Sequence, residues 1–282
     1  MKTINGLLIG TMSALLVACG GGGGGSSTPA ATTPPAPVQQ NAAGIWNQTY
    51  VVSSGVNTGD TIKSVMLVSP SSSFFTAGVN QQNGCAGIGF GQAAISGTSF
   101  TATEQAAVIT FTNIPGINVN CSYSDGSTTA TVSVTGTVTT GESLVATGTG
   151  TTSFGTSLGS STDTFTYSTL NSIPPSLATV AGSYTTADGS TLTIDSAGNI
   201  SELNNTTGCT YSGTISIPSS SYNIYNVTVA VSACNSTYAS SDGLIYSGLA
   251  AYNDTVSPNE LMFGVSTSSG GTFYAIAAAI QK

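Results

Sequence analysis

The sequence has no histidine, and its only basic residues are Lys2, Lys63 and Lys282. Without histidine, the chain lacks the commonest general base and the usual partner of a nucleophilic serine. So few cations also exclude nucleic acid as a partner, because binding to its backbone needs many contacts between phosphates and Lys or Arg. We therefore expect a protein that is not an enzyme, with binding and structural roles remaining.

Two patterns with catalytic potential do occur. Residues 155–159 (GTSLG) match the G-x-S-x-G nucleophile elbow, but no helix pattern and no histidine follow, so we expect no such site. Paired carboxylates could act as glycosidase acid and base. The candidates mostly lie in expected turns, where aspartate commonly binds the backbone: Asp188, Asp195, Glu202, Asp242, Asp254 and Glu260.

No metal or cofactor is expected. Besides histidine, the chain lacks a C-x-x-C zinc pair and a D-x-D-x-D-G calcium loop.

The N-terminus has the pattern of a lipoprotein signal. Residues 7–18 are almost wholly apolar but would reach only about 18 Å as a helix, short of the roughly 30 Å hydrocarbon core. We predict that residues 1–18 are a cleaved signal peptide. Its end, Leu16-Val17-Ala18-Cys19, resembles a bacterial lipobox, and this resemblance implies that Cys19 is acylated and anchors the chain in the membrane.

The segment after the cysteine is predicted to be a tether. Residues 19–42 contain six consecutive glycines and then a stretch rich in Ser, Thr and Pro, a composition typical of flexible and semi-rigid linkers. Gly20 follows the cysteine where an aspartate tends to retain lipoproteins at the inner membrane. The resemblance therefore implies an outer-membrane location, facing the periplasm or the cell surface.

The mature chain is acidic, and its composition predicts an all-β fold. Lys63 and Lys282 stand against eleven carboxylates, a formal charge of −9, while only 5% of residues are charged. The recurring β-branched and aromatic residues can support a core.

With Cys19 assigned to the lipid, four cysteines remain for disulfides in an exported protein. Three connectivities are open, and clustering favours Cys85 with Cys121 and Cys209 with Cys234.

Pro174-Pro175 indicates a boundary between two antiparallel β domains, residues 43–173 and 178–282. Both begin alike, Ala43-Gly44-Ile45-Trp46 and Ala181-Gly182-Ser183-Tyr184, which suggests duplication. In the second domain, alternation and short turns predict eight strands closing into an up-and-down barrel, with a β-sandwich as the alternative. The predicted strands are 182–186, 190–195, 198–204, 210–218, 223–233, 245–253, 260–267 and 272–281.

The second disulfide can be placed on these strands. If Ile215 lies opposite Val227, and Tyr211 opposite Val231, then Cys209 faces the residue before Cys234. A one-residue offset changes the face of the strand, so we expect a bulge or the end of the ladder at this bond.

An eight-stranded barrel is filled by its own side chains or holds one small ligand. Six aromatic residues of the second half are expected to face inward and fill it: Tyr211, Tyr225, Tyr246, Tyr252, Phe263 and Tyr274.

Several segments resemble known families. Gly208–Gly213, Asn223–Val227 and Tyr246–Ala250 resemble poorly characterised proteobacterial lipoproteins over about the last hundred residues. The tether is similar to that of surface lipoproteins such as transferrin-binding protein B, which carry eight-stranded barrels. Gly44-x-Trp46 resembles the start of the lipocalins, where the tryptophan closes one end of the barrel.

These features predict a lipid-anchored outer-membrane lipoprotein that acts as a binding or structural module, with an unidentified protein or glycan as possible partner. Two alternatives stay open: a barrel that carries a small apolar ligand, and a carboxylate-dependent glycan hydrolase.

Overall fold

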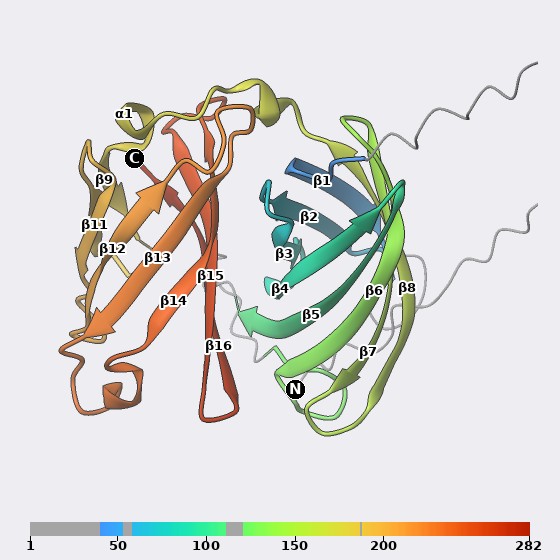
Figure 1. Ribbon diagram of the computed structural model, residues 1–282. Helices are drawn as coiled ribbons and strands as arrows, with labels where there is room; N and C mark the ends of the chain where they lie inside the picture. Colours follow the sequence, from blue (N-terminus) through green and yellow to red (C-terminus); the bar gives the residue numbers. More distant parts are fainter. Residues whose placement is uncertain (1–39, 53–57, 111–120, 187) are drawn as a thin grey trace, which may run out of the picture.

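The computed structural model describes residues 40–52, 58–110, 121–186 and 188–282. The predicted signal peptide, Cys19 and most of the predicted tether lie outside these ranges. In the described part of the chain, sixteen strands form two closed antiparallel barrels of eight strands each (Figure 1). The predicted all-β fold with two antiparallel domains is confirmed, and the sandwich alternative for the second domain is wrong.

The first barrel has an up-and-down order from β1 to β8, and the pairing of Trp46 with Tyr167 closes β1 onto β8. The first half is therefore also a barrel, although glycine-rich stretches blur several of its strand boundaries in the sequence. Its strands are β1 (Gly44–Val51), β2 (Thr61–Val68), β3 (Ser73–Asn80), β4 (Cys85–Ser96), β5 (Ser99–Thr110), β6 (Thr129–Thr139), β7 (Ser143–Thr152) and β8 (Ser157–Tyr167).

The second barrel consists of the eight strands predicted, each within about two residues of its expected ends. Pairing of Gln281 with Thr185 joins the last strand to the first. The strands are β9 (Gly182–Thr185), β10 (Thr191–Ile194), β11 (Asn199–Leu203), β12 (Thr210–Ser216), β13 (Tyr225–Ser232), β14 (Ile245–Asn253), β15 (Glu260–Ser269) and β16 (Thr272–Gln281).

Both barrels begin with the same local arrangement. The Trp46 indole N–H donates to the Ala42 carbonyl at 2.7 Å, and the Tyr184 hydroxyl donates to the Val180 carbonyl at 2.7 Å. Both rings are fully buried. The glycine two residues earlier has a positive φ in each case, +130° and +152°, a region that favours glycine. The similar sequences at the start of the two halves thus correspond to similar local structures.

The disulfide of the second barrel lies where the hairpin register places it. Ile215 pairs with Val227 and Tyr211 with Val231, as predicted. The β12–β13 ladder ends at the pair Thr210–Ser232, directly beside Cys209. Cys209 bonds Cys234, and the intervening Ala233 has a positive φ of 55°. The backbone at Ala233, just beyond the end of the ladder, therefore accommodates the one-residue offset between the two cysteines, as expected.

The first barrel has its own disulfide, Cys85–Cys121, so both predicted pairings are present. It ties the start of β4 to the segment before β6. That segment is also held by Asp125, which accepts hydrogen bonds from the Ser127 backbone and from the Thr152 hydroxyl at the end of β7.

Two short helices connect the barrels: η1 (Thr169–Ser172), a 3₁₀ turn, and α1 (Leu177–Val180). A third, η2 (Ala239–Ser241), lies between β13 and β14. The predicted boundary at Pro174-Pro175 falls between the first two. Among the described residues, none of the helices has the length and apolar character needed to cross a membrane.

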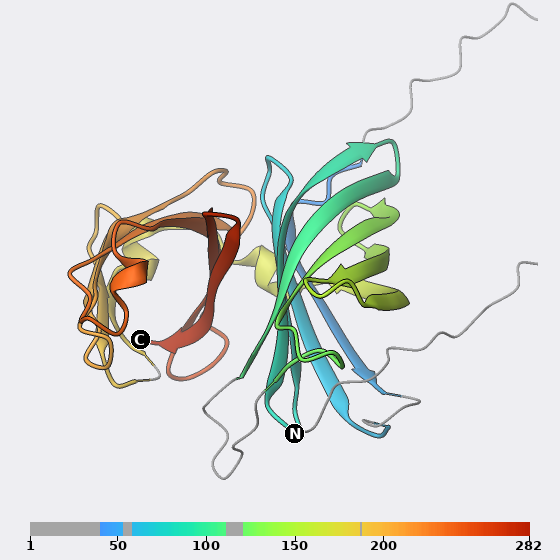
Figure 2. The ribbon, with the colours of Figure 1, turned by 90° about the horizontal axis from the view of Figure 1, so that it is seen from below.

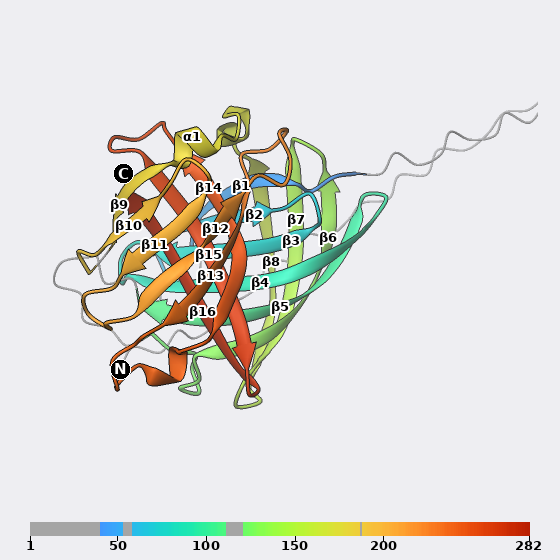
Figure 3. The same cartoon turned by 60° about the vertical axis from the view of Figure 1, so that its left-hand side comes forward.

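The barrels pack side by side through an apolar interface (Figures 1 and 2). Outward-facing Leu67, Phe75 and Phe90 of the first barrel meet Leu249 and Phe273 of the second. The strands of the two barrels cross at this contact (Figure 3). Part of the first barrel's outer wall is therefore as apolar as a core.

Candidate functional site

The interior of the second barrel is filled by its own side chains. Tyr184, Tyr225 and Tyr252 are fully buried and pack with aliphatic residues from seven strands of that barrel, β10 to β16. This packing counts against a ligand carried inside the second barrel. The cluster includes every aromatic residue expected to face inward: Tyr211, Tyr225, Tyr246, Tyr252, Phe263 and Tyr274.

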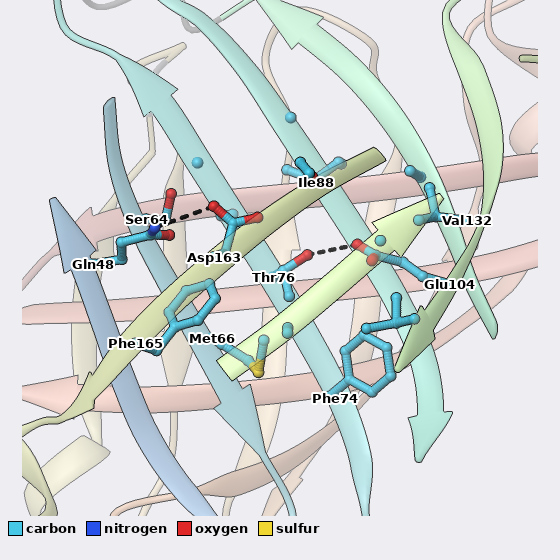
Figure 4. A pocket seen from close by; sticks show the side chains of 18 of the residues that line it. Gln48, Ser64, Met66, Phe74, Thr76, Ile88, Glu104, Val132, Asp163 and Phe165 are labelled. Carbon is cyan, nitrogen blue, oxygen red and sulfur yellow. Dashed lines mark hydrogen bonds between the residues drawn. The ribbon is translucent and has the colours of Figure 1, made fainter. Parts of the chain in front are cut away.

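The first barrel instead encloses a cavity of about 400 Å³ (Figure 4). This volume lies within the range of small-molecule sites, roughly 300–1,000 Å³. One end is closed by an apolar cluster around Trp46, Phe100 and Leu144. The cavity continues from there toward Tyr50, Asn80 and the end of the barrel that carries the Cys85–Cys121 bond.

Glycines keep this barrel hollow. On β4, the residues that share the inward face with Ala93 include Gly87, Gly89 and Gly91. A Cβ atom at Gly87 would meet nothing within 4 Å, whereas one at Gly91 would lie 2.6 Å from the Phe74 ring. The glycine at position 87 therefore leaves open space in the cavity, and the glycine at position 91 lets the Phe74 ring pack against β4.

Most of the lining is apolar, and the polar residues at its middle form a belt (Figure 4). We call Gln48, Ser64, Thr76, Glu104 and Asp163 the polar belt; they come from β1, β2, β3, β5 and β8.

Glu104 reaches the belt by crossing β4. Its Oε1 accepts a hydrogen bond of 2.7 Å from the Thr76 hydroxyl on β3. A Cβ at Gly89 would lie 1.4 Å from that oxygen, so glycine is required for the crossing. Burial raises the pKa of the Glu104 carboxyl, the bond from Thr76 opposes the rise, and the nearby Asp163 adds to it.

Asp163 is the second acid of the belt. Its Oδ1 accepts a hydrogen bond of 3.1 Å from the Gln48 side-chain amide on the neighbouring β1. Burial raises the pKa of its carboxyl, and the bond from Gln48 opposes this. Two carboxyl groups with raised pKa values therefore line one cavity.

The other titratable groups of the lining are phenols. Burial, together with the charge of Asp163, raises the pKa of Tyr50 to about 12. Burial, with the charge of Glu104, raises the pKa of Tyr123 to about 12. Both rings are neutral at physiological pH and can act only as hydrogen-bonding groups. The single lysine of this barrel, Lys63, is exposed, between inward-facing neighbours on β2.

Two of the acids proposed for a hydrolase, Asp188 and Asp195, behave as turn residues. Asp188 accepts from the Ser190 backbone N–H, and Asp195 from that of Asn199. Burial acts to raise the pKa of Asp188, but hydrogen bonds from Thr186 and Ser190 outweigh it and hold the pKa at about 2. The other four are Glu202 in β11, Asp242, which accepts from the Cys234 N–H, Asp254 in the β14–β15 turn, and Glu260 at the start of β15.

Sequence reasoning missed the two acids of the cavity. Each occupies an inward position in a strand: Glu104 alternates with Ala102 and Ala106, and Asp163 with Phe165. An acid at an inward position of an alternating strand was the available signal. It was hidden because the inward faces of this half are not consistently apolar.

The G-x-S-x-G match lies in a strand-to-strand turn. Gly155 is in the β7–β8 turn and Ser157 begins β8, so no helix follows the serine, as expected. Within the described ranges, His, Cys, Asp and Glu side chains form no group of three that could hold a metal ion.

No protein-family model matches the chain, and no curated protein or solved structure matches it.

Proposed function

We propose that this protein is a lipid-anchored lipoprotein of the bacterial outer membrane whose first barrel binds a small, largely apolar molecule. The cavity carries this proposal, since it lies inside a closed barrel and is mainly apolar with a few polar groups at its middle. Such a combination is typical of ligand sites, in which apolar contact supplies affinity and polar groups fix orientation. The second barrel, filled and disulfide-bonded, serves as a structural support.

Binding is favoured over glycan hydrolysis. Glu104 and Asp163 share the cavity, which is the one observation in favour of a carboxylate-dependent hydrolase. A sugar, however, needs hydrogen-bonding partners around its ring, and the residues around the acids include Val132, Phe165 and Met66 (Figure 4).

The neutral dye N-phenyl-1-naphthylamine, which fluoresces in apolar surroundings, tests the binding site. Trp46 is the only tryptophan and belongs to the first barrel. We expect saturable dye emission that is sensitised by excitation of Trp46.

Gly87→Phe, which fills the cavity, should abolish this emission. Ala94→Phe should not, because Ala94 is exposed on the opposite face of the same strand. Equal binding by both variants would place the dye elsewhere and refute the site.

The anchor and the location have separate tests. Cys19 is proposed as the lipid attachment point, so palmitate labelling in cells should disappear in Cys19→Ala; labelling that persists would refute the anchor. Membrane fractionation should place the wild-type chain in the outer membrane. Protease treatment of intact cells then distinguishes the cell surface from the periplasmic side.

A further inference from the structure

The ligand's charge can be inferred from the groups that the cavity lacks. The whole sequence contains three basic residues: Lys2 in the predicted signal peptide, the exposed Lys63, and Lys282, whose ammonium donates to the Thr179 carbonyl at the second barrel. Among the described residues, the two acids inside the first barrel therefore have no basic side chain to pair with. An ionised carboxylate is costly to bury unless it is paired.

We propose that the first barrel selects small molecules that carry a protonated amine on an apolar body, with the amine bound between Glu104 and Asp163 in the polar belt. This inference rests on the proposed function of the cavity. The two acids face the same space (Figure 4). Each accepts a hydrogen bond on one oxygen, Glu104 from Thr76 and Asp163 from Gln48. An ammonium group donates three hydrogen bonds and can therefore serve both carboxylates.

The apolar part of the ligand has a defined place. Met66, Phe74 and Phe165 lie beside the belt, toward the end of the barrel closed by the Trp46 cluster. An aliphatic or aromatic body can occupy this region while its amine stays at the belt. The negative charge of the whole chain also favours the approach of cations.

Binding is expected to depend on pH. An ammonium stabilises the ionised form of the acids, so at a pH below their raised pKa values binding displaces their protons to solvent. Affinity should fall as the pH is lowered through this range. The other titratable groups of the lining are the phenols Tyr50 and Tyr123, which stay neutral there. Lys63 lies on β2 but is exposed.

Three probes with one tail and different charge test the inference: octylamine, octanol and octanoate. Each is used to displace N-phenyl-1-naphthylamine from the wild-type chain. A charge-assisted hydrogen bond predicts that octylamine binds about tenfold or more tightly than octanol, and octanoate more weakly than both. Lowering the pH should weaken octylamine and leave octanol unchanged.

Variants assign the selectivity to the two acids. Glu104→Gln and Asp163→Asn, singly and together, keep side-chain size, and the glutamine can still accept from Thr76. They should remove the preference for octylamine while octanol binding persists. Glu142→Gln, at an exposed turn of the same barrel, should leave the preference intact.

The outcomes separate the two proposals. Equal binding of octylamine and octanol to the wild type, or a preference that survives in the double variant, overturns the amine inference but leaves the ligand site. Failure of dye and all three probes to bind overturns the proposed function itself. The wild-type preference and its pH dependence decide the matter even where a variant does not fold.

Discussion

The same substitution at two glycines of β4 should have opposite effects on stability. Gly87 and Gly89 lie two residues apart on the inward face. A Cβ at Gly87 meets open space within 4 Å, whereas one at Gly89 would lie 1.4 Å from Oε1 of Glu104. We therefore expect Gly87→Val to stabilise the first barrel and Gly89→Val to destabilise it.

The magnitudes follow from these surroundings. Replacing a strand glycine removes a conformational penalty of about 0.5–1 kcal/mol. The valine also buries part of its side chain, for which full burial would contribute about 1.5–3 kcal/mol. Gly87→Val should thus raise the free energy of unfolding by about 1–2 kcal/mol. Gly89→Val displaces the Glu104 carboxyl from Thr76, and losing a hydrogen bond to a charged group costs about 1.5–3 kcal/mol.

Urea unfolding followed by Trp46 fluorescence measures both variants, because this tryptophan reports on the first barrel alone. The expected results are a higher midpoint for Gly87→Val and a lower one for Gly89→Val, with similar slopes. Destabilisation by both variants to the same extent would show that Gly87 does not face open space, and would refute the hollow barrel.

Three further outcomes are expected. Replacing Cys209 and Cys234 with serine should lower the unfolding free energy by about 3.5 kcal/mol, the loop-entropy value for their separation of 25 residues, as measured by urea unfolding with and without reductant. Glu104→Gln should stabilise the protein near neutral pH and not below the ordinary glutamate pKa of about 4.3. The reason is that a raised folded-state pKa makes ionisation destabilising only as the pH rises above the unfolded value; a benefit of equal size at both pH values would contradict it. Gly264→Val should destabilise the chain by about 1–3 kcal/mol in thermal unfolding, because its Cβ would lie 2.3 Å from the Phe75 ring of the other barrel; an unchanged midpoint would contradict that contact.

The second barrel could be predicted from sequence because its strands follow simple rules. Tyr225, Val227 and Val231 are buried and alternate with exposed polar residues of β13, while Val229 and Ala230 between them are half-buried. Short turns then fix neighbouring strands and their register. The disulfide offset followed from the same register.

The first barrel could not be predicted in this way because part of its pattern is inverted. In residues 87–91 (GIGFG), the glycines face the cavity while Ile88 and Phe90 face the second barrel. Strand alternation assumes that the apolar face is the interior, so it assigns this stretch wrongly. Only the packing of the two barrels shows that the apolar face is an interface and that the glycine face lines a cavity.

The location of Glu104 was hidden for a related reason. Nothing local in the sequence TATEQAAV indicates that a glutamate crosses the adjacent strand over Gly89 to Thr76. That contact joins residues from three strands and depends on a missing side chain. Sites of this kind emerge from the pairing of neighbouring strands rather than from spacing along the chain.

The central claim is that the first barrel, and not the second, binds a small molecule. Methyl NMR of residues 19–282, with Cys19→Ser to keep the chain soluble, tests it most directly. On titration with octylamine, we expect the methyl signals of Val132, Val134 and Leu144 to shift and to show intermolecular Overhauser effects. We expect no such changes at Val227 and Leu261. Signals that respond only in the second barrel, or no response at saturating octylamine together with failure to bind the neutral dye, would contradict it.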